Sequence, residues 1–247
     1  MAQDQPTKIL LALQFWKGDQ AQAMRVARLI ADLEPRHSEF ADFLFVSRFD
    51  CEQDLKTVEY VSTKFNTHTY VNRHRRGTGW PHGCNDLWFG TMDHVYSFSE
   101  AKRFPPYKAV LTFEADSCPL VPNWHRELSR AWDQMAAPKD VKMFGARVEH
   151  PLPHINGNAM FSADLKYLYW ISRLIGGCDP TKGWDFILAR DFKREGWADC
   201  PMMKSHWQKK TMGDEEVNAL RSAGIVFLHG VKDDSVISHM RKKFVGG

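Results

Sequence analysis

Apolar runs alternate with amphipathic stretches through the first 150 residues of the chain. The runs are short and largely apolar, which is typical of strands covered on both faces. The predicted strands are residues 8–15, 41–50, 67–72, 108–116 and 141–149. Between them, apolar residues recur every three or four positions, which predicts amphipathic helices. The predicted helices are residues 19–35, 53–65, 86–103 and 123–137.

This alternation predicts an α/β fold with a Rossmann-like, mostly parallel sheet flanked by helices. The pattern changes after Pro151, where residues 150–162 resemble a loop with a strand only at its end. Mainly helical stretches follow, and then a late strand at 225–230 and a basic tail at 236–244. The second part of the chain is therefore predicted to be largely helical.

Composition narrows the class of protein. The chain has 247 residues, of which 43% are hydrophobic, enough for a sizeable core. The formal net charge of +3 allows an acidic partner without requiring one. Five cysteines, none in a C-x-x-C pair, indicate free thiols in a reducing compartment and no zinc knuckle. The N-terminal apolar run is too short to span a membrane and has no basic residues before it, so we expect a soluble, cytoplasmic protein.

Two carboxylates stand at the end of a predicted strand. Glu114 and Asp116 are one residue apart, so their side chains point to the same side of that strand. In open α/β sheets, ligands bind outside the carboxyl ends of the strands. Adjacent carboxylates repel each other unless a cation lies between them, and oxygen ligands suit Mg²⁺ or Mn²⁺. The pair therefore indicates a metal site, or else a turn-capping Asp116 beside an ion-paired Glu114.

The sequence resembles the GT-A glycosyltransferases, which use nucleotide-sugar donors, at four motifs in chain order. Glu114-Ala115-Asp116 resembles their D-x-D metal motif, with Glu in place of the first Asp. Residues 154–162 resemble the glycine-containing loop that faces donor and acceptor. Residues 183–192 resemble the helix start that carries the acidic catalytic residue. Residues 227–233 resemble the C-terminal segment that carries the metal-binding histidine. The likeness extends over residues 8–233 and implies a GT-A-like fold.

The resemblance implies Mn²⁺ or Mg²⁺ as cofactor and a nucleotide-diphospho-sugar as co-substrate. The implied metal ligands are Asp116, Glu114 and His229, and a histidine ligand favours Mn²⁺. Asp185 is the implied catalytic residue: a general base in an inverting enzyme, or a stabilising group in a retaining one. Their alternative roles are a hydrogen-bonded core residue for His229 and a helix N-cap for Asp185.

The resemblance also implies sugar and nucleotide contacts. The residues implied to contact the diphosphate and sugar are Ala115, Asn156, Gly157 and Asn158. An Asn-Gly pair is also common in turns, so a polar turn is the alternative. The residues implied near the base and ribose are Gln14, Phe15, Trp16 and Asp50, with Phe15 or Trp16 stacking on the base. Asn85 and Asp86 either contact the donor or cap the helix that follows them. Arg76, in the run 73–76, either contacts phosphate or lies in a solvated loop.

We therefore predict one GT-A-like domain over residues 1–247. Residues 8–150 would form the nucleotide-sugar half and residues 151–247 the acceptor and catalytic half. A sugar nucleotidyltransferase would need a glycine-rich signature with Arg and Lys after the first strand, and a dinucleotide oxidoreductase a G-x-G-x-x-G motif there. The sequence there, QFWKGDQ, has a single glycine. A binding module without catalysis stays an alternative.

The acceptor is left open by the sequence. The compact size and the basic clusters at 73–76 and 241–243 resemble stand-alone phage enzymes that add sugars to hydroxymethylated DNA bases. Such chemistry would need a base extruded from the duplex. A glycan or lipid-linked acceptor is an equal alternative, and a protein acceptor is a third.

Overall fold

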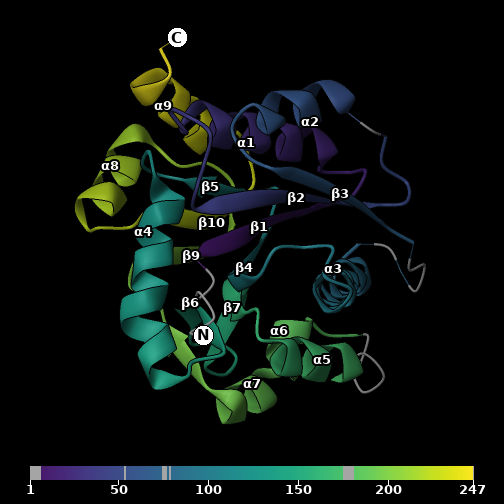
Figure 1. Cartoon of the computed structure of the whole chain (residues 1–247). Helices are drawn as coiled ribbons and strands as arrows, with labels where there is room; N and C mark the ends of the chain where they lie inside the picture. The colour runs from purple at the N-terminus through teal and green to yellow at the C-terminus, as the bar shows by residue number, and fades with distance from the viewer. Residues whose placement is uncertain (1–6, 53, 74–76, 78, 175–180, 247) are drawn as a thin grey trace.

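A seven-stranded sheet forms the centre of the computed structural model, which describes residues 7–52, 54–73, 77, 79–174 and 181–246 (Figure 1). The strands, in spatial order, are β3 (Thr67–Asn72), β2 (Ala41–Arg48), β1 (Lys8–Phe15), β4 (Tyr107–Glu114), β7 (His154–Ser162), β6 (Met143–Val148) and β8 (Trp197–Asp199). All pairings among them are parallel except those of β7, which is antiparallel to both β4 and β6. The predicted mostly parallel sheet is confirmed.

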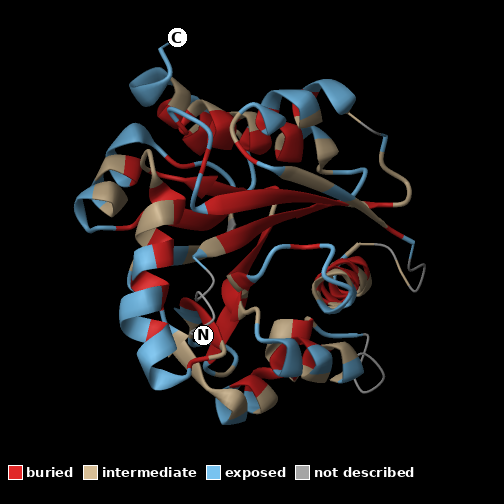
Figure 2. Cartoon of the chain, in the orientation of Figure 1, coloured by how far each residue is buried: buried red, intermediate tan, exposed pale blue. Residues whose placement is uncertain are grey.

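Helices cover both faces of this sheet. They include α1 (Gln20–Asp32), α2 (Leu55–Ser62), α3 (His82–Glu100) and α4 (Trp124–Ala131), which continues as a π-helical turn over Trp132–Ala136. On β1, Ile9, Leu11 and Leu13 pack in a cluster with α1 and α4, whereas Leu10 and Ala12 pack in a second cluster with α3. Figure 2 shows the central strands largely buried. Because both faces are covered, these strands appear in the sequence as continuous apolar runs.

A second, smaller sheet has three strands and joins the strand that follows β4 to strands from the C-terminal part of the chain. Its order is β5 (Ser117–Pro119), β10 (Phe227–Val231) and β9 (Met203–Lys209). Further α-helices among the described residues are α5 (Leu165–Leu174), α6 (Trp184–Ile187), α7 (Ala189–Glu195), α8 (Asp214–Ser222) and α9 (Ser235–Phe244). The pairing of β5 with β10 is antiparallel and sets His229 opposite Ser117. The late strand predicted at 225–230 is confirmed as β10, and the predicted basic tail forms α9.

The prediction of a loop with a strand only at its end over residues 150–162 is confirmed for the strand at the end, but the strand begins earlier than predicted, at His154. The nine residues of β7 lie inside the sheet, between β4 and β6. Their Asn-Gly pair forms no hairpin turn, because the polar groups bond to the neighbouring strand: Gly157 O accepts from Thr112 Oγ1 at 3.0 Å, and Asn158 Oδ1 accepts from Glu114 N at 2.7 Å. A buried strand of this kind has no alternation that could mark it in the sequence.

Strands from both predicted halves share one sheet, since β7 pairs with β4. Within the described residues, no helix is both long and apolar enough to cross a membrane. The described cysteines are all free, namely Cys51, Cys84, Cys118 and Cys200, whereas Cys178 lies outside the described residues. The predicted free thiols are thus observed for these four.

Candidate functional site

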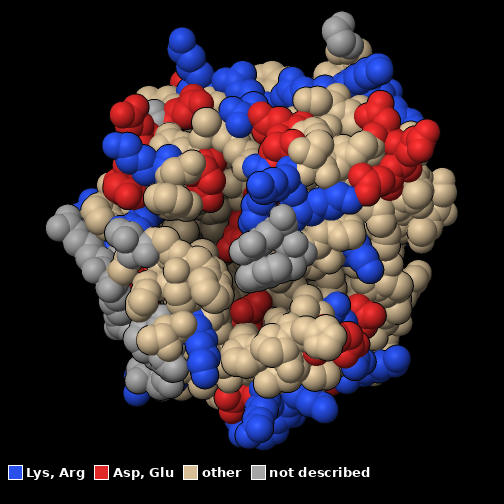
Figure 3. Space-filling view, turned by 180° about the vertical axis from the view of Figure 1, so that it is seen from behind, with Lys and Arg blue, Asp and Glu red and all other residues tan. Residues whose placement is uncertain are grey.

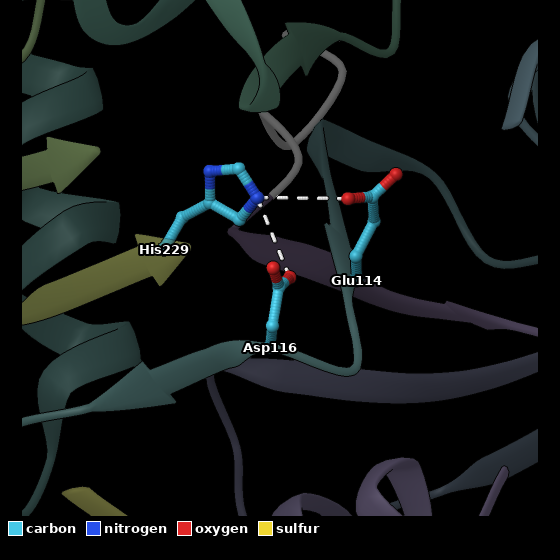
Figure 4. Close-up of side chains that lie close together, drawn as sticks. All are labelled: Glu114, Asp116 and His229. Atoms are coloured by element: carbon cyan, nitrogen blue, oxygen red, sulfur yellow. Dashed lines mark ion pairs between the residues drawn. The ribbon is translucent and has the colours of Figure 1, made fainter. Parts of the chain in front are cut away.

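Three side chains from distant parts of the sequence converge at the carboxyl end of β4 (Figure 4). Glu114 is the last residue of β4, Asp116 lies in the turn before β5, and His229 lies on β10. His229 Nε2 is 3.5 Å from Glu114 Oε2 and 3.4 Å from Asp116 Oδ1. One ligand atom from each residue lies within 4.8 Å of the others. The structure therefore brings together all three predicted metal ligands.

Backbone pairing and neighbouring side chains hold this cluster in place. Gly230 N donates to Asp116 O at 3.1 Å, which fixes β10 against the turn. Ser205 Oγ hydrogen-bonds His229 Nδ1 at 3.0 Å. The opposite ring nitrogen, Nε2, therefore faces the carboxylates; it is buried and has no hydrogen-bond partner among the described residues. Asn158 Oδ1 accepts from Glu114 N and, at 2.9 Å, from Ser117 Oγ, so it braces the turn between the two acids.

The charges of the cluster are balanced within the protein. Burial by itself raises the pKa of Asp116, but the nearby charges of His229 and Lys232, with the hydrogen bond from Lys232, outweigh burial and hold it below its usual range. Burial by itself lowers the pKa of His229, but Asp116 and Glu114 raise it to about 9. Lys232 Nζ contacts Asp116 Oδ2. Two cationic side chains thus face a pair of carboxylates.

This donor set fits a divalent cation. Two carboxylates and one imidazole provide oxygen and nitrogen ligands of the kind that bind Mg²⁺ and Mn²⁺, and the imidazole favours Mn²⁺. The buried Nε2 of His229 lies within ion-pair distance of both carboxylates but makes no hydrogen bond among the described residues, as suits a ligand atom. A bound cation would replace the positive charge that His229 and Lys232 now supply, so binding would release protons from His229.

Asp185 lies on α6 and faces β7. Its Oδ2 accepts from Gly157 N at 3.1 Å and its Oδ1 from Phe186 N at 2.9 Å, while His154 Nε2 is 3.9 Å from Oδ2. Burial raises the pKa of Asp185 despite these favourable contacts, and the charge of Glu114 adds to the increase. The N-cap of α6 is Gly183, so the alternative role of Asp185 as an N-cap is wrong.

Three further residues of this region had no role in the sequence analysis. Asp19, whose Oδ1 accepts from Trp16 N at 2.9 Å, has its pKa raised to about 7 by burial, with added repulsion from Glu114 and Asp116. Cys84, on α3, has its pKa raised by burial and by the same acids. Lys232 is the third. Its sequence signal was its place in the motif 227–233, three residues after His229.

The four candidates near the base differ in how far they are buried. Gln14 is buried, and its amide donates to Thr91 Oγ1 at 2.7 Å. Phe15 is 4% exposed and packs in the core, whereas Trp16 is 40% exposed. Asp50 lies in the turn after β2, with its Oδ1 3.6 Å from Arg48 Nε. Between the two aromatic candidates, it is Trp16 whose ring a base can reach.

The remaining candidates lie at the start of α3 and before it. The helix begins at His82, so the alternative that Asn85 or Asp86 caps it is wrong. Asn85 is buried and bonds backbone groups near α6. The backbone carbonyl of Asp86 accepts from Asn72 Nδ2 at 2.6 Å. Arg76 lies outside the described residues.

The glycine and asparagines of β7 line the same region. Asn156 Oδ1 accepts from Asn158 N at 3.0 Å and from Asn158 Nδ2 at 3.1 Å. Asn158 is therefore engaged on both its oxygen and its nitrogen by the protein itself. The space-filling view of Figure 3 shows a hollow in the molecular surface with acidic side chains inside it and basic ones beside it.

No model of a known protein family matches the sequence, and no curated protein matches it. Solved structures do match. GlyE, a glycosyltransferase of Streptococcus pneumoniae TIGR4, has 12% identity and a TM-score of 0.55, over 93% of this chain and 56% of GlyE. The bifunctional glycosyltransferase WbbM has 8% identity and a TM-score of 0.56, over 97% of this chain and 50% of WbbM.

A third similar structure is a glycosyltransferase involved in the glycosylation of the major capsid of PBCV-1. It has 12% identity and a TM-score of 0.52, over 95% of this chain and 99% of that one. The chain spans about half the length of GlyE and WbbM and nearly all of the PBCV-1 enzyme. At such low identity the likeness concerns the fold. The chain therefore has the α/β fold of these glycosyltransferase structures, with the Glu114, Asp116 and His229 cluster at the carboxyl end of its central strand β4.

Proposed function

We propose that this protein is a metal-dependent glycosyltransferase that moves a sugar from a nucleotide-diphospho-sugar to a hydroxyl group. The observation that carries the proposal is the convergence of Glu114, Asp116 and His229 beside Asp185, on a fold shared with solved glycosyltransferases. Neither the pair of acids nor the fold alone would be enough, because folds of this class host many functions.

The cluster would bind the diphosphate end of the donor. Asp116 and His229 are the proposed direct ligands of Mn²⁺ or Mg²⁺, and Glu114 a ligand directly or through water. The ion, when bound, would neutralise the negative charge that grows on the departing diphosphate. Lys232 already contacts Asp116 Oδ2, so its ammonium group lies where it can exchange that carboxylate for a phosphate oxygen.

Asp185 would act on the acceptor. Backbone N–H groups of Gly157 and Phe186 hold its carboxylate, and such fixed placement is what a general base needs. Its raised pKa makes it a stronger base than an ordinary aspartate. If the sugar is transferred with inversion, Asp185 accepts the proton of the acceptor hydroxyl. If configuration is retained, it stabilises the positive charge that develops on the sugar. The anomeric configuration of the product decides between these roles.

The base and ribose would lie near the ends of β1 and β2. We propose that the exposed ring of Trp16 stacks on the base and that Asp50 binds a ribose hydroxyl or a base N–H. Gly157 and Asn156, beside Asp185, would face the transferred sugar.

The test is thermal stability against a panel of nucleoside diphosphates, with and without Mn²⁺. Ligands that bind the folded state raise the melting temperature by mass action, so a Mn²⁺-dependent rise for one nucleotide is expected. Asp116→Ala should abolish that rise. A well-folded protein that responds to no nucleotide would overturn the proposal. Binding without hydrolysis of the matching nucleotide sugar would instead identify a binding module.

A DNA acceptor is a narrower hypothesis that rests on the basic clusters. Arg75 and Arg76 lie outside the described residues, and Arg241 of the second cluster pairs with Asp32 at 3.1 Å. The test is binding of duplex DNA at low salt by the double variant Arg75→Glu, Arg76→Glu, because phosphate contacts weaken steeply as positive charge is lost. Unchanged binding would remove the reason to favour DNA over a glycan or lipid-linked acceptor.

A further inference from the structure

The side chain of Asn85 connects two helices that are far apart in the sequence. Asn85 is on α3 and is 6% exposed. Its Oδ1 accepts from Trp184 N at 2.9 Å and its Nδ2 donates to Lys182 O at 2.9 Å. These two backbone groups lie on either side of Gly183, so one amide side chain binds the chain immediately before and after the N-cap of α6.

The bond to Trp184 N supplies what α6 lacks. The first N–H groups of a helix have no partner within the helix and are usually satisfied by the side chain of the N-cap residue. Here the N-cap is Gly183, which has no side chain. A Cβ at Gly183 would lie 2.9 Å from Asp185 Oδ1, so a side chain there would push that carboxylate aside. Asn85 therefore caps α6 from another helix.

A second contact from α3 fixes the same segment. Trp88, one helical turn after Asn85, stacks on Trp184 with ring centroids 3.6 Å apart and planes 13° from parallel. Trp184 in turn lies against Gly157, where an added Cβ would be 2.6 Å from its ring. The backbone and the ring of Trp184 are thus both held by α3, and Gly157 is the residue whose N–H binds Asp185.

We infer that Asn85 is a positioning residue that sets the carboxylate of Asp185 against β7 by capping α6 from α3. The inference rests on the proposed function, in which Asp185 acts on the acceptor, and it departs from the expectation that Asn85 contacts the donor. Its amide is already committed to the protein backbone on both its oxygen and its nitrogen. Its effect on catalysis would be indirect, through the place of Asp185.

The experiment compares Asn85→Leu and Asn85→Asp with the native protein. Leucine has nearly the same size and removes both hydrogen bonds, whereas aspartate keeps an acceptor for Trp184 N and loses the donor to Lys182 O. The first readout is hydrogen exchange of the Trp184 amide, which should accelerate about tenfold or more in Asn85→Leu and less in Asn85→Asp. The second readout is hydrolysis of the nucleotide sugar whose diphosphate binds best, which should fall on the order of 100-fold in Asn85→Leu. The Kd of that diphosphate with Mn²⁺ should stay unchanged.

Asn72→Ala is the matched control. Asn72 is also buried, and its amide likewise donates a hydrogen bond to a backbone carbonyl, that of Asp86 on α3. It should lower the melting temperature without accelerating exchange at Trp184. If Trp184 exchange is unchanged in Asn85→Leu, the inference is overturned. A weaker diphosphate affinity in Asn85→Leu would also overturn it, by making Asn85 a donor ligand. If the native protein binds no nucleotide, the proposed function fails, and the exchange data still decide whether Asn85 caps α6.

Discussion

Lys232 and His229 contact different oxygens of the Asp116 carboxylate. The ammonium group of Lys232 meets Oδ2, and Nε2 of His229 lies 3.4 Å from Oδ1. The Asp116 side chain is 7% exposed, whereas that of Lys232 is 49% exposed, so the lysine reaches the buried acid from the solvent side. A divalent cation at Asp116 would either displace this ammonium group or share the carboxylate with it. A displaced ammonium group would be free to bind a phosphate.

Lys232→Met should therefore change two affinities in opposite directions. Mn²⁺ alone should bind about 2- to 5-fold tighter, because a half-exposed ion pair that competes with it is worth about 1 kcal/mol or less. A nucleoside diphosphate with Mn²⁺ should bind about tenfold more weakly, because a charge-assisted hydrogen bond is lost. Isothermal titration calorimetry measures both. The control is Lys142→Met, which breaks an ion pair with Asp140 and should change neither of the two affinities.

Ser205→Ala tests how His229 is oriented. The Oγ of Ser205 is 3.0 Å from His229 Nδ1. Loss of such a supporting hydrogen bond typically lowers metal affinity about 10- to 100-fold, and we expect a loss of about that size in Ser205→Ala. The melting temperature of the metal-free protein should change little. Ser172→Ala removes a similar hydroxyl on α5 and is the matched control.

A second variant, His229→Ala, tests whether the histidine is a ligand. Equal loss of metal affinity and of stability in His229→Ala would indicate a core histidine in place of a ligand.

Gly230→Ala should unfold the small sheet or displace His229. Gly230 has φ +97°, and a Cβ there would lie 1.6 Å from the backbone oxygen of His206. A clash with backbone cannot be relieved by a side-chain rotation, so the loss of stability should exceed about 4 kcal/mol. Gly224→Ala is the matched control, since Gly224 has φ +83° but open space around its Cβ position. Its cost should be about 1–2 kcal/mol, the cost of a left-handed backbone alone. Urea denaturation measures both, and equal losses would show that the close approach does not matter.

Asp185→Asn should separate binding from turnover. Asparagine keeps an oxygen for a backbone N–H but accepts no proton, so turnover should fall about 10²- to 10⁴-fold while the diphosphate Kd is unchanged. Because burial raises the pKa of Asp185, native turnover should fall on the acid side at a higher pH than an ordinary aspartate would give. Asp191→Asn, on α7, is the control. An Asp185→Asn enzyme with native turnover would exclude the general-base role.

Stability should depend on pH through buried histidines away from the site. His94 packs against Tyr70, Phe98 and Phe104, and burial, with a smaller contribution from His68, lowers its pKa to about 4. The unfolded chain binds this proton near the ordinary pKa of 6.5. The stabilisation is therefore complete above pH 6.5 and is lost as the pH falls toward 4, by up to about 1.4 kcal/mol per pH unit.

The test uses His94→Phe, which keeps an aromatic ring in this cluster and removes the titrating group. Its free energy of unfolding should fall less between pH 7 and about pH 5 than that of the native protein. Urea denaturation at the two pH values measures the difference. Identical changes in the two proteins would mean that His94 is not buried as a neutral group.

The sequence alone determined the alternation of strands and helices, because apolar periodicity reports how each local segment is covered. It also placed Glu114 and Asp116 together, since they are neighbours at the end of one strand. The resemblance added Asp185 and His229 as candidates. It assigned no role to Lys232 and no positioning role to Asn85. Lys232 is far along the chain from Asp116, and Asn85 is far from Trp184, so the sequence does not show that they meet.

The tertiary structure decided which distant segments meet. β7 enters the sheet antiparallel between β4 and β6, although its polar Asn-Gly pair is typical of a turn. The pairing of β5 with β10 carries His229 to Asp116, and Asn85 reaches Trp184 across 99 residues. Periodicity records the burial of a segment but not the identity of its neighbour. Strand order and contacts between helices are set by packing of the whole core, and here that packing assembles the site.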